Sequence, residues 1–157
     1  MTFITSQSLT LKEFLEQYGD HPDVIVLDEN QLKTEPLWQR EPIICNGNTI
    51  KLVVEVVSTN WQDDYARKVE EYAFLGIPEY WIVDYRGLGG VAFIGKPKQR
   101  CDPAAFQAAK ERAPREPTFT VSQLVDDEYI NTKYYQNKLI QSNLFPEIQL
   151  YLDDLLI

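Results

Sequence analysis

Runs of apolar residues separated by short polar segments predict a sheet with one prominent helix. Residues 52–57 read Leu-Val-Val-Glu-Val-Val, which is the pattern of a buried strand. Similar β-branched and aromatic runs predict further strands at 23–27 and 80–84. Between the strands at 52–57 and 80–84, residues 61–75 carry apolar side chains at helical spacing, and a glycine and a proline follow directly. Strand, helix and strand with short connections predict a βαβ-like unit in a mixed α/β domain.

Weaker patterns on either side of this unit predict shorter elements. They are a helix at 9–15, strands at 91–94, 119–124, 128–132 and 138–141, and a closing strand or helix over 145–157. Residues 28–50 read as a loop with one helical turn near Pro36. Charged residues, alanines and prolines at about 99–117 predict a surface insertion in a single domain that spans residues 1–157.

Composition and charge describe an acidic globular protein. The chain has 157 residues, of which 44% are hydrophobic, so it is long enough for one domain with a real core. Its net charge of −9 argues against a protein that coats nucleic acid electrostatically. Residues 96–115 nevertheless carry six basic and two acidic side chains, a net charge of +4. This basic segment is either a contact for a phosphate backbone or a solvated loop.

Several kinds of protein are excluded or disfavoured by what the chain lacks. No apolar run is long enough to span a membrane, and the first residues lack the pattern of a secretory signal. Cys45 and Cys101 form no CxxC pair, which predicts a cytoplasmic protein without a zinc site. The one histidine, His21, excludes His-rich metal centres and argues against a Ser-His-Asp triad.

Glu55 is the residue that fits its surroundings least. It lies in the middle of the apolar strand at 52–57, where removing a carboxylate from water costs several kcal/mol unless a cation or donors compensate. A valine would fit the strand without this cost. Two interpretations therefore remain open at this point. Glu55 either meets a positive partner such as a metal ion or a lysine, or is a structural carboxylate that is half solvated at the strand end.

Lys68 and Asp23 are the candidates that could converge on Glu55. Lys68 lies three residues after Tyr65 and four before Tyr72, so it shares the apolar face of the predicted helix. It either extends to solvent or meets Glu55, because the helix directly follows the Glu55 strand. Asp23, at the start of another strand, supplies a second carboxylate. Two converging carboxylates suit Mg²⁺, and with a nearby ammonium they suit phosphodiester hydrolysis.

Other residues near these candidates have simpler interpretations. The aromatic residues Trp61, Tyr72, Tyr80 and Trp81 are expected in the core rather than in a platform for stacking bases. Asp63 and Asp64 are expected to stabilise the N-terminus of the helix.

Four segments carry a resemblance to a known family. They are residues 22–27, 52–58, 63–72 and 76–84, the last reading Gly-Ile-Pro-Glu-Tyr-Trp-Ile-Val-Asp. Together they resemble the Uma-type restriction endonuclease family of the PD-(D/E)XK nuclease superfamily. The resemblance is dense over residues 22–98 and looser at both ends. It implies a restriction-endonuclease-like mixed β-sheet core flanked by helices, and a metal-dependent DNA endonuclease.

The resemblance also assigns roles to individual residues. It implies that Asp23 and Glu55 are ligands of Mg²⁺ or Mn²⁺, with the backbone carbonyl of Val56 as a further ligand. The lysine that the superfamily usually has two positions after the glutamate is replaced by Val57. In this family the lysine lies in the following helix, which points to Lys68. Asp23, Glu55 and Lys68 would thus be the catalytic residues acting on DNA, in a homodimer because two strands need two active sites.

The chain departs from the family pattern before Pro22. Similar proteins usually have several dozen residues between the first helix and this strand, whereas here the predicted helix at 9–15 runs almost directly into His21. The sheet is therefore expected to be incomplete on its N-terminal side. This departure keeps a second interpretation open, a catalytically inactive, truncated nuclease-like domain that binds a partner or is vestigial.

Overall fold

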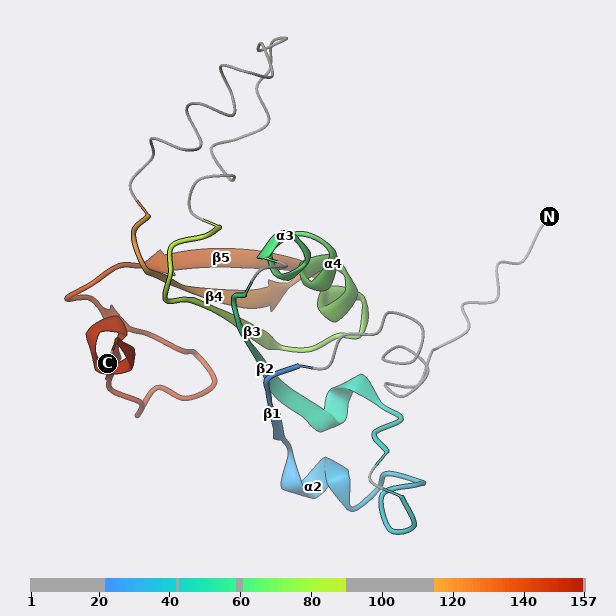
Figure 1. Ribbon diagram of the computed structural model, residues 1–157. Coiled ribbons are helices and arrows are strands. Elements are labelled where there is room, and N and C mark those ends of the chain that lie inside the picture. Colours follow the sequence, from blue (N-terminus) through green and yellow to red (C-terminus); the bar gives the residue numbers. More distant parts are fainter. Residues whose placement is uncertain (1–21, 42, 59–60, 90–114, 157) are drawn as a thin grey trace, which may run out of the picture.

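A mixed five-stranded sheet forms the centre of the computed structural model, which describes residues 22–41, 43–58, 61–89 and 115–156 (Figure 1). In spatial order the strands are β1 (Val24–Leu27), β2 (Ile50–Val56), β3 (Glu79–Asp84), β4 (Thr118–Val125) and β5 (Glu128–Tyr134). β2 and β3 are parallel, and the other neighbouring pairs are antiparallel. The predicted α/β class, with a mixed sheet and flanking helices, is confirmed.

Two short helices connect the parallel strands and pack on one face of the sheet (Figure 1). They are α3 (Trp61–Tyr65) and α4 (Arg67–Phe74). The predicted helix at 61–75 is therefore present but broken at Ala66, whose φ of −124° and ψ of −74° are not helical. Gly76 follows α4 with a φ of 72°, a conformation that glycine adopts without a steric penalty. β2 and β3 are parallel, and a parallel pair needs a crossover connection, which α3 and α4 provide. The predicted βαβ-like unit is therefore confirmed.

The remaining elements of the described residues are short. They are α2 (Glu29–Leu32), the 3₁₀ helices η1 (Gly47–Thr49) and η2 (Leu152–Leu155), and the paired strands β6 (Leu139–Ile140) and β7 (Leu150–Tyr151). The closing segment after residue 145 thus contains both a short strand and a short helix. No helix within the described ranges is long and apolar enough to cross a membrane.

The prediction of a loop over residues 28–50 was wrong at α2. Asp28 precedes this helix, and its Oδ1 accepts hydrogen bonds from the backbone N–H groups of Asn30 at 2.8 Å and Gln31 at 3.2 Å. A side-chain cap of this kind satisfies backbone donors that the first helical turn leaves unpaired. The helical turn expected near Pro36 is present, because the N–H groups of Arg40 and Glu41 both donate to the carbonyl of Leu37.

Four predictions fall outside the described residues. They are the helix at 9–15, the strand at 91–94, most of the insertion at about 99–117, and the shortened segment before Pro22.

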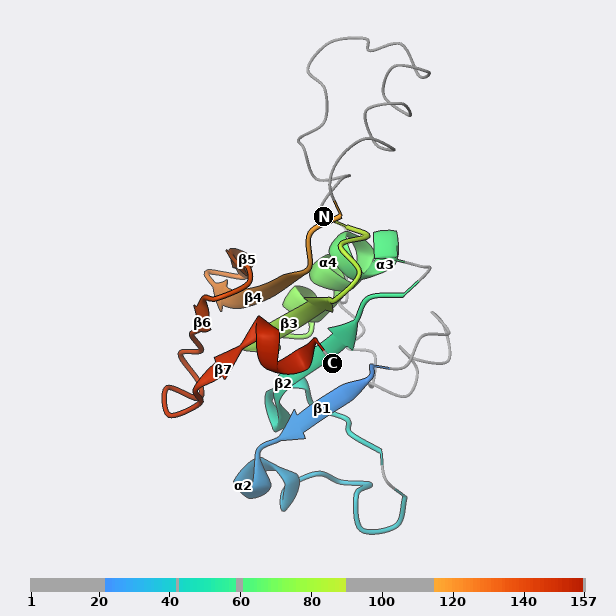
Figure 2. The ribbon, with the colours of Figure 1, turned by 60° about the vertical axis from the view of Figure 1, so that its left-hand side comes forward.

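Apolar layers cover both faces of the sheet, which explains the continuous apolar runs of β2 and β3. On the helix-covered face, strand residues meet aromatic side chains of α3 and α4: Val53, Val57, Tyr65, Tyr72, Tyr80 and Ile82. On the other face, strand residues pack against the C-terminal segment: Leu52, Trp81, Phe119, Val121, Ile140 and Leu152. Figure 2 shows η2 lying across this second face. The core positions predicted for Tyr72, Tyr80 and Trp81 are confirmed.

The buried carboxylate of Glu35 organises the chain just before β2. Its Oε2 accepts the N–H of Cys45 at 2.9 Å, and its Oε1 accepts the N–H of Asn46 at 3.0 Å and the hydroxyl of Thr49. Burial alone would raise the pKa of Glu35, but these hydrogen bonds outweigh burial and hold the pKa below its usual value. Glu35 therefore stabilises the fold in its ionised form.

Glu35→Gln is expected to lower the free energy of unfolding by about 1–3 kcal/mol at neutral pH, because an amide cannot accept at both positions. Folding lowers the pKa of Glu35, so the stabilisation is present above the ordinary pKa of 4.5 and is lost as the pH falls through the folded-state value. Urea unfolding at neutral pH and at about pH 3 measures the effect. The difference between wild type and variant should narrow at the lower pH, and a constant difference would contradict the prediction.

Candidate active site

Glu55 lies on the helix-covered face of β2, between the core residues Val53 and Val57. Only 2% of Glu55 is exposed, yet two donors reach its Oε1 atom. The hydroxyl of Tyr72 donates to Oε1 at 2.7 Å, and Nζ of Lys68 lies 3.1 Å from the same oxygen. The carboxylate that is costly in an apolar strand therefore has a positive partner and a neutral donor.

Lys68 lies between two carboxylates rather than extending to solvent. Its Nζ is 2.9 Å from Oδ1 of Asp64, in addition to its contact with Glu55. Asp64 and Lys68 are 5% and 6% exposed. Asp64, Lys68 and Tyr72 follow one another at intervals of four residues, and their burial and contacts show that all three lie on the sheet-facing side of α3 and α4. The structure thus gathers one ammonium, one phenol and two carboxylates in a buried cluster, defined here as Glu55, Asp64, Lys68 and Tyr72.

Burial and neighbouring charges shift the pKa values of three side chains in this buried cluster. Burial raises the pKa of Glu55 above its usual value, although the hydrogen bond from Tyr72 and the charge of Lys68 oppose this shift. Burial alone would lower the pKa of Lys68, but the hydrogen bond to Asp64 and the charge of Glu55 outweigh it and raise the pKa. Burial and the charge of Glu55 also raise the pKa of the Tyr72 phenol. At neutral pH Lys68 and Tyr72 are therefore both protonated donors.

Asp23 lies immediately before β1, at the same end of β2 as Glu55. β1 pairs Val24 with Val54 and Ile25 with Val53. Continuing this antiparallel register by one residue sets Asp23 across from Glu55. The Oδ2 atom of Asp23 accepts the N–H of Val56 at 2.6 Å, and Asp23 is exposed where Glu55 is buried. Glu55 is a residue of β2 and Asp23 directly precedes the neighbouring strand β1, with Asp23 nearer to solvent.

The backbone of Val56 faces the same edge of β2. Its N–H points toward Asp23, and the N–H and C=O of one strand residue point to the same side, so the carbonyl also faces β1. Within the described ranges, no three side chains of the types His, Cys, Asp and Glu gather closely enough to hold a metal ion. Two carboxylates and one carbonyl are nevertheless an all-oxygen donor set, which suits Mg²⁺ because this ion keeps several waters. The chemical type of these donors therefore matches the preference of such an ion.

The polar contacts of two residues were not predicted from the sequence. Asp64 was expected at the helix N-terminus and Tyr72 in the core, whereas Asp64 also pairs with Lys68 and Tyr72 also donates to Glu55. The signal that could have found both is their spacing of four residues on either side of Lys68.

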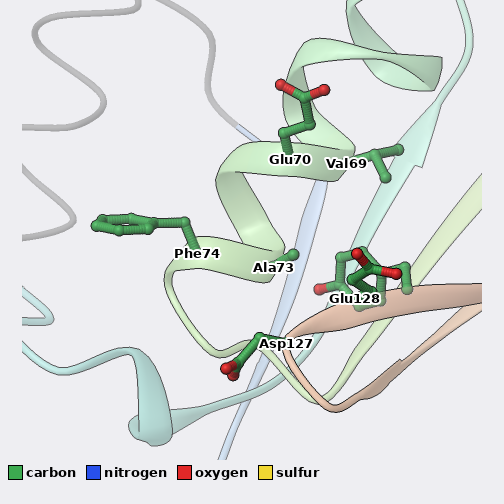
Figure 3. A pocket seen from close by; sticks show the side chains of 7 residues that line it. Val69, Glu70, Ala73, Phe74, Asp127 and Glu128 are labelled. Carbon is green, nitrogen blue, oxygen red and sulfur yellow. The ribbon is translucent and has the colours of Figure 1, made fainter.

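A separate hollow of about 660 Å³ lies between α4 and the turn that joins β4 to β5 (Figure 3). Acidic and apolar side chains line it: Val69, Glu70, Ala73, Phe74, Asp127, Glu128 and Tyr129. None of these seven residues belongs to the buried cluster or is Asp23. The candidate active site is therefore the buried cluster and the adjoining edge of β2, and not this hollow.

Comparisons with known proteins assign the chain to a family. No curated protein and no solved structure is similar enough to match the chain. A family model does match, that of Uma2, which carries the description "Putative restriction endonuclease", and the match covers residues 1–153. This range includes Asp23 and the whole buried cluster. The family resemblance predicted from four segments of the sequence is confirmed, and the chain belongs to the Uma2 family.

Proposed function

We propose that this protein is a metal-dependent DNA endonuclease that hydrolyses phosphodiester bonds at Asp23, Glu55 and Lys68. The observation that carries the proposal is the buried contact of 3.1 Å between Lys68 and Glu55, at the strand end that Asp23 adjoins. Apolar residues of similar volume often stabilise a protein core as well as a buried ion pair does. A catalytic role therefore explains the Lys68–Glu55 pair better than a contribution to stability. Membership of the Uma2 family supports DNA as the substrate.

Asp23, Glu55 and the carbonyl of Val56 are the groups that we assign to a Mg²⁺ or Mn²⁺ ion. When bound, the ion would lower the pKa of a water molecule and stabilise charge on the phosphate. Tyr72 and Lys68 both contact Oε1 of Glu55 and thereby fix the orientation of this carboxylate, so we assign Oε2 to the ion. The Lys68 ammonium supplies a fixed positive charge beside the position of the phosphate.

We propose a homodimer as the form that cuts both DNA strands, because each protomer contributes one set of Asp23, Glu55 and Lys68. Intracellular DNA as the substrate requires the protein to act in the cytoplasm, which the pattern of cysteines also predicts.

One observation favours a second candidate function, that of a non-catalytic nuclease-like domain which binds a partner. Asp23 is exposed, and its Oδ2 already accepts the backbone N–H of Val56. If Asp23 keeps this contact when metal and DNA are present, Glu55 and Lys68 would form only a structural ion pair.

Cleavage of supercoiled plasmid by the purified full chain tests these functions. We expect cleavage with Mg²⁺ or Mn²⁺ and none with EDTA. Asp23→Asn is expected to lower the rate at least about 100-fold, because an amide is a weaker ligand for a hard cation than a carboxylate. A homodimer would produce linear plasmid directly, whereas a monomer would first accumulate nicked circles.

Glu29→Gln is the matched control for Asp23→Asn, because it also neutralises an exposed carboxylate near β1. Its rate should equal that of wild type. Cleavage that persists in EDTA, or equal rates for the two variants, would overturn the metal assignment. A folded wild-type protein that neither cleaves DNA nor binds Mn²⁺ in calorimetry would favour the non-catalytic candidate.

A further inference from the structure

Asp64 is a buried carboxylate without a role in the proposed reaction so far. It lies on α3, outside the strand edge that carries Asp23 and Glu55, and its Oδ1 is 2.9 Å from Nζ of Lys68. Both side chains of this pair are less than one-tenth exposed. A buried carboxylate is costly unless it is paired, and the contact with Lys68 supplies Asp64 with an opposite charge.

The ammonium of Lys68 has three N–H donors in a tetrahedral arrangement. One points to Oε1 of Glu55 and one to Oδ1 of Asp64. With two donors fixed in direction, the third N–H also has a fixed direction. A lysine held by Glu55 alone could still turn about that one contact, because its stem of four carbons is flexible.

Asp64 is itself held against the sheet. Its backbone carbonyl accepts the hydroxyl of Tyr80 at 3.0 Å, and Tyr80 is a fully buried residue of β3. The Tyr80 ring also packs edge-on against the Tyr72 ring, with centroids 5.0 Å apart. Asp64 therefore offers Lys68 an acceptor whose position is fixed by the packing of α3 on β3.

An ordinary helical ion pair on the same segment provides a comparison. Arg67 and Glu71 are also four residues apart, at 3.5 Å, but their side chains are 39% and 16% exposed. Solvent screens such a partly exposed pair more than a buried one, so its contribution to stability is smaller. The Asp64–Lys68 contact differs because it is buried and because its lysine also contacts Glu55.

We infer that Asp64 is a positioning residue, which holds the Lys68 ammonium against Glu55 so that the third N–H is presented to the phosphate of bound DNA. This inference rests on the proposed function. It predicts that Asp64 acts on turnover through Lys68 and makes no contact with DNA of its own.

Wild type, Asp64→Asn, Asp64→Glu and the control Glu71→Gln test the inference in the full chain. The first readout is the NMR signal of the Lys68 ammonium, assigned with Lys68→Arg, since a buried and hydrogen-bonded ammonium exchanges its protons slowly. The second is kcat and KM for plasmid cleavage. Asp64→Asn should lose the signal and lower kcat about 10- to 100-fold with little change in KM, as loss of an orienting partner does.

Asp64→Glu should restore part of both the signal and kcat, and Glu71→Gln should change neither. If Asp64→Asn does not fold, the Lys68 signal and kcat of Asp64→Glu are compared with those of Glu71→Gln instead. An unchanged Lys68 signal in Asp64→Asn, or a kcat equal to that of Glu71→Gln, would overturn the inference. If wild type does not cleave DNA, the proposed function fails, but the positioning contact can still be tested by NMR. Loss of the Lys68 signal in Asp64→Asn would then support this contact, and retention of the signal would overturn it.

Discussion

Replacing Lys68 by methionine is expected to lower the free energy of unfolding by about 3–5 kcal/mol, the effect of leaving buried charge without its partner. Methionine has a similar length but no charge, so the carboxylates of Glu55 and Asp64 would lose the ammonium that both of them contact. Urea unfolding followed by tryptophan fluorescence at neutral pH measures the change. Folding raises the pKa of Glu55 above its ordinary value of 4.5, so the folded protein takes up a proton at Glu55 as the pH falls toward 4.5. A protonated Glu55 has no charge that needs the ammonium. The stability lost in Lys68→Met should therefore become smaller as the pH falls.

Two further variants make this prediction specific. The triple variant Lys68→Met, Glu55→Gln, Asp64→Asn should recover most of the lost stability, because it removes the two negative charges together with the ammonium that neutralises them. Lys33→Met changes an exposed lysine that lies 3.9 Å from Glu29, and its cost should stay below about 1 kcal/mol. A triple variant as unstable as Lys68→Met alone would show that lost packing, and not the loss of the ammonium's charge, causes the effect.

Replacing Glu55 by glutamine is expected to reduce metal-dependent cleavage at least about 100- to 1000-fold, the range found when one group that stabilises transition-state charge is removed. The amide keeps the shape of the side chain and can still accept the hydroxyl of Tyr72, but it is a poor ligand for Mg²⁺. Initial rates of plasmid cleavage measure the loss. Calorimetric titration with Mn²⁺ should show a parallel loss of binding.

Glu79→Gln is a closely matched control for Glu55→Gln. Glu79 is also a buried glutamate, 1% exposed, on the neighbouring strand β3. Its Oε1 accepts the indole N–H of Trp81, which belongs to the opposite apolar layer of the sheet. Glu79→Gln should therefore leave the cleavage rate within about 2-fold of wild type, which corresponds to about 0.4 kcal/mol in activation free energy. Equal losses in both variants would mean that buried glutamates serve only the fold.

Sequence patterns predicted the parts of the structure that follow from local periodicity. The βαβ-like unit was predictable because strands and helix each repeat apolar residues at their own period, and Lys68 could be matched with Glu55 because the helix directly follows the strand. The burial of Asp64 was not predictable in this way. An acidic residue in a first helical turn is already explained by local electrostatics, and its contact with Lys68 depends on how α3 packs against β3.

Two other features depended on context that periodicity does not record. Helix α2 has four residues, which is too short for an apolar stripe, and its one signal is the capping residue Asp28. The exposure of Asp23 depends on which residues pack beside β1. No property of residues 23–27 specifies those residues. Its contact with the N–H of Val56 joins residues 33 positions apart and arises only when the two strands pair.

The buried cluster comes from one strand and the two helices that follow it, and this short stretch of chain has a consequence for folding. All four side chains come from residues 55–72, and the contact between Glu55 and Tyr72 spans only 17 positions. The chain entropy lost in closing such a loop is small, and contacts of short sequence separation form fast. The ammonium and its acceptors can therefore assemble early, before β3 pairs with β4, which is distant in the sequence. Variation in the length of the chain between β3 and β4 would then alter the rate of late folding steps while leaving the assembly of the cluster unchanged.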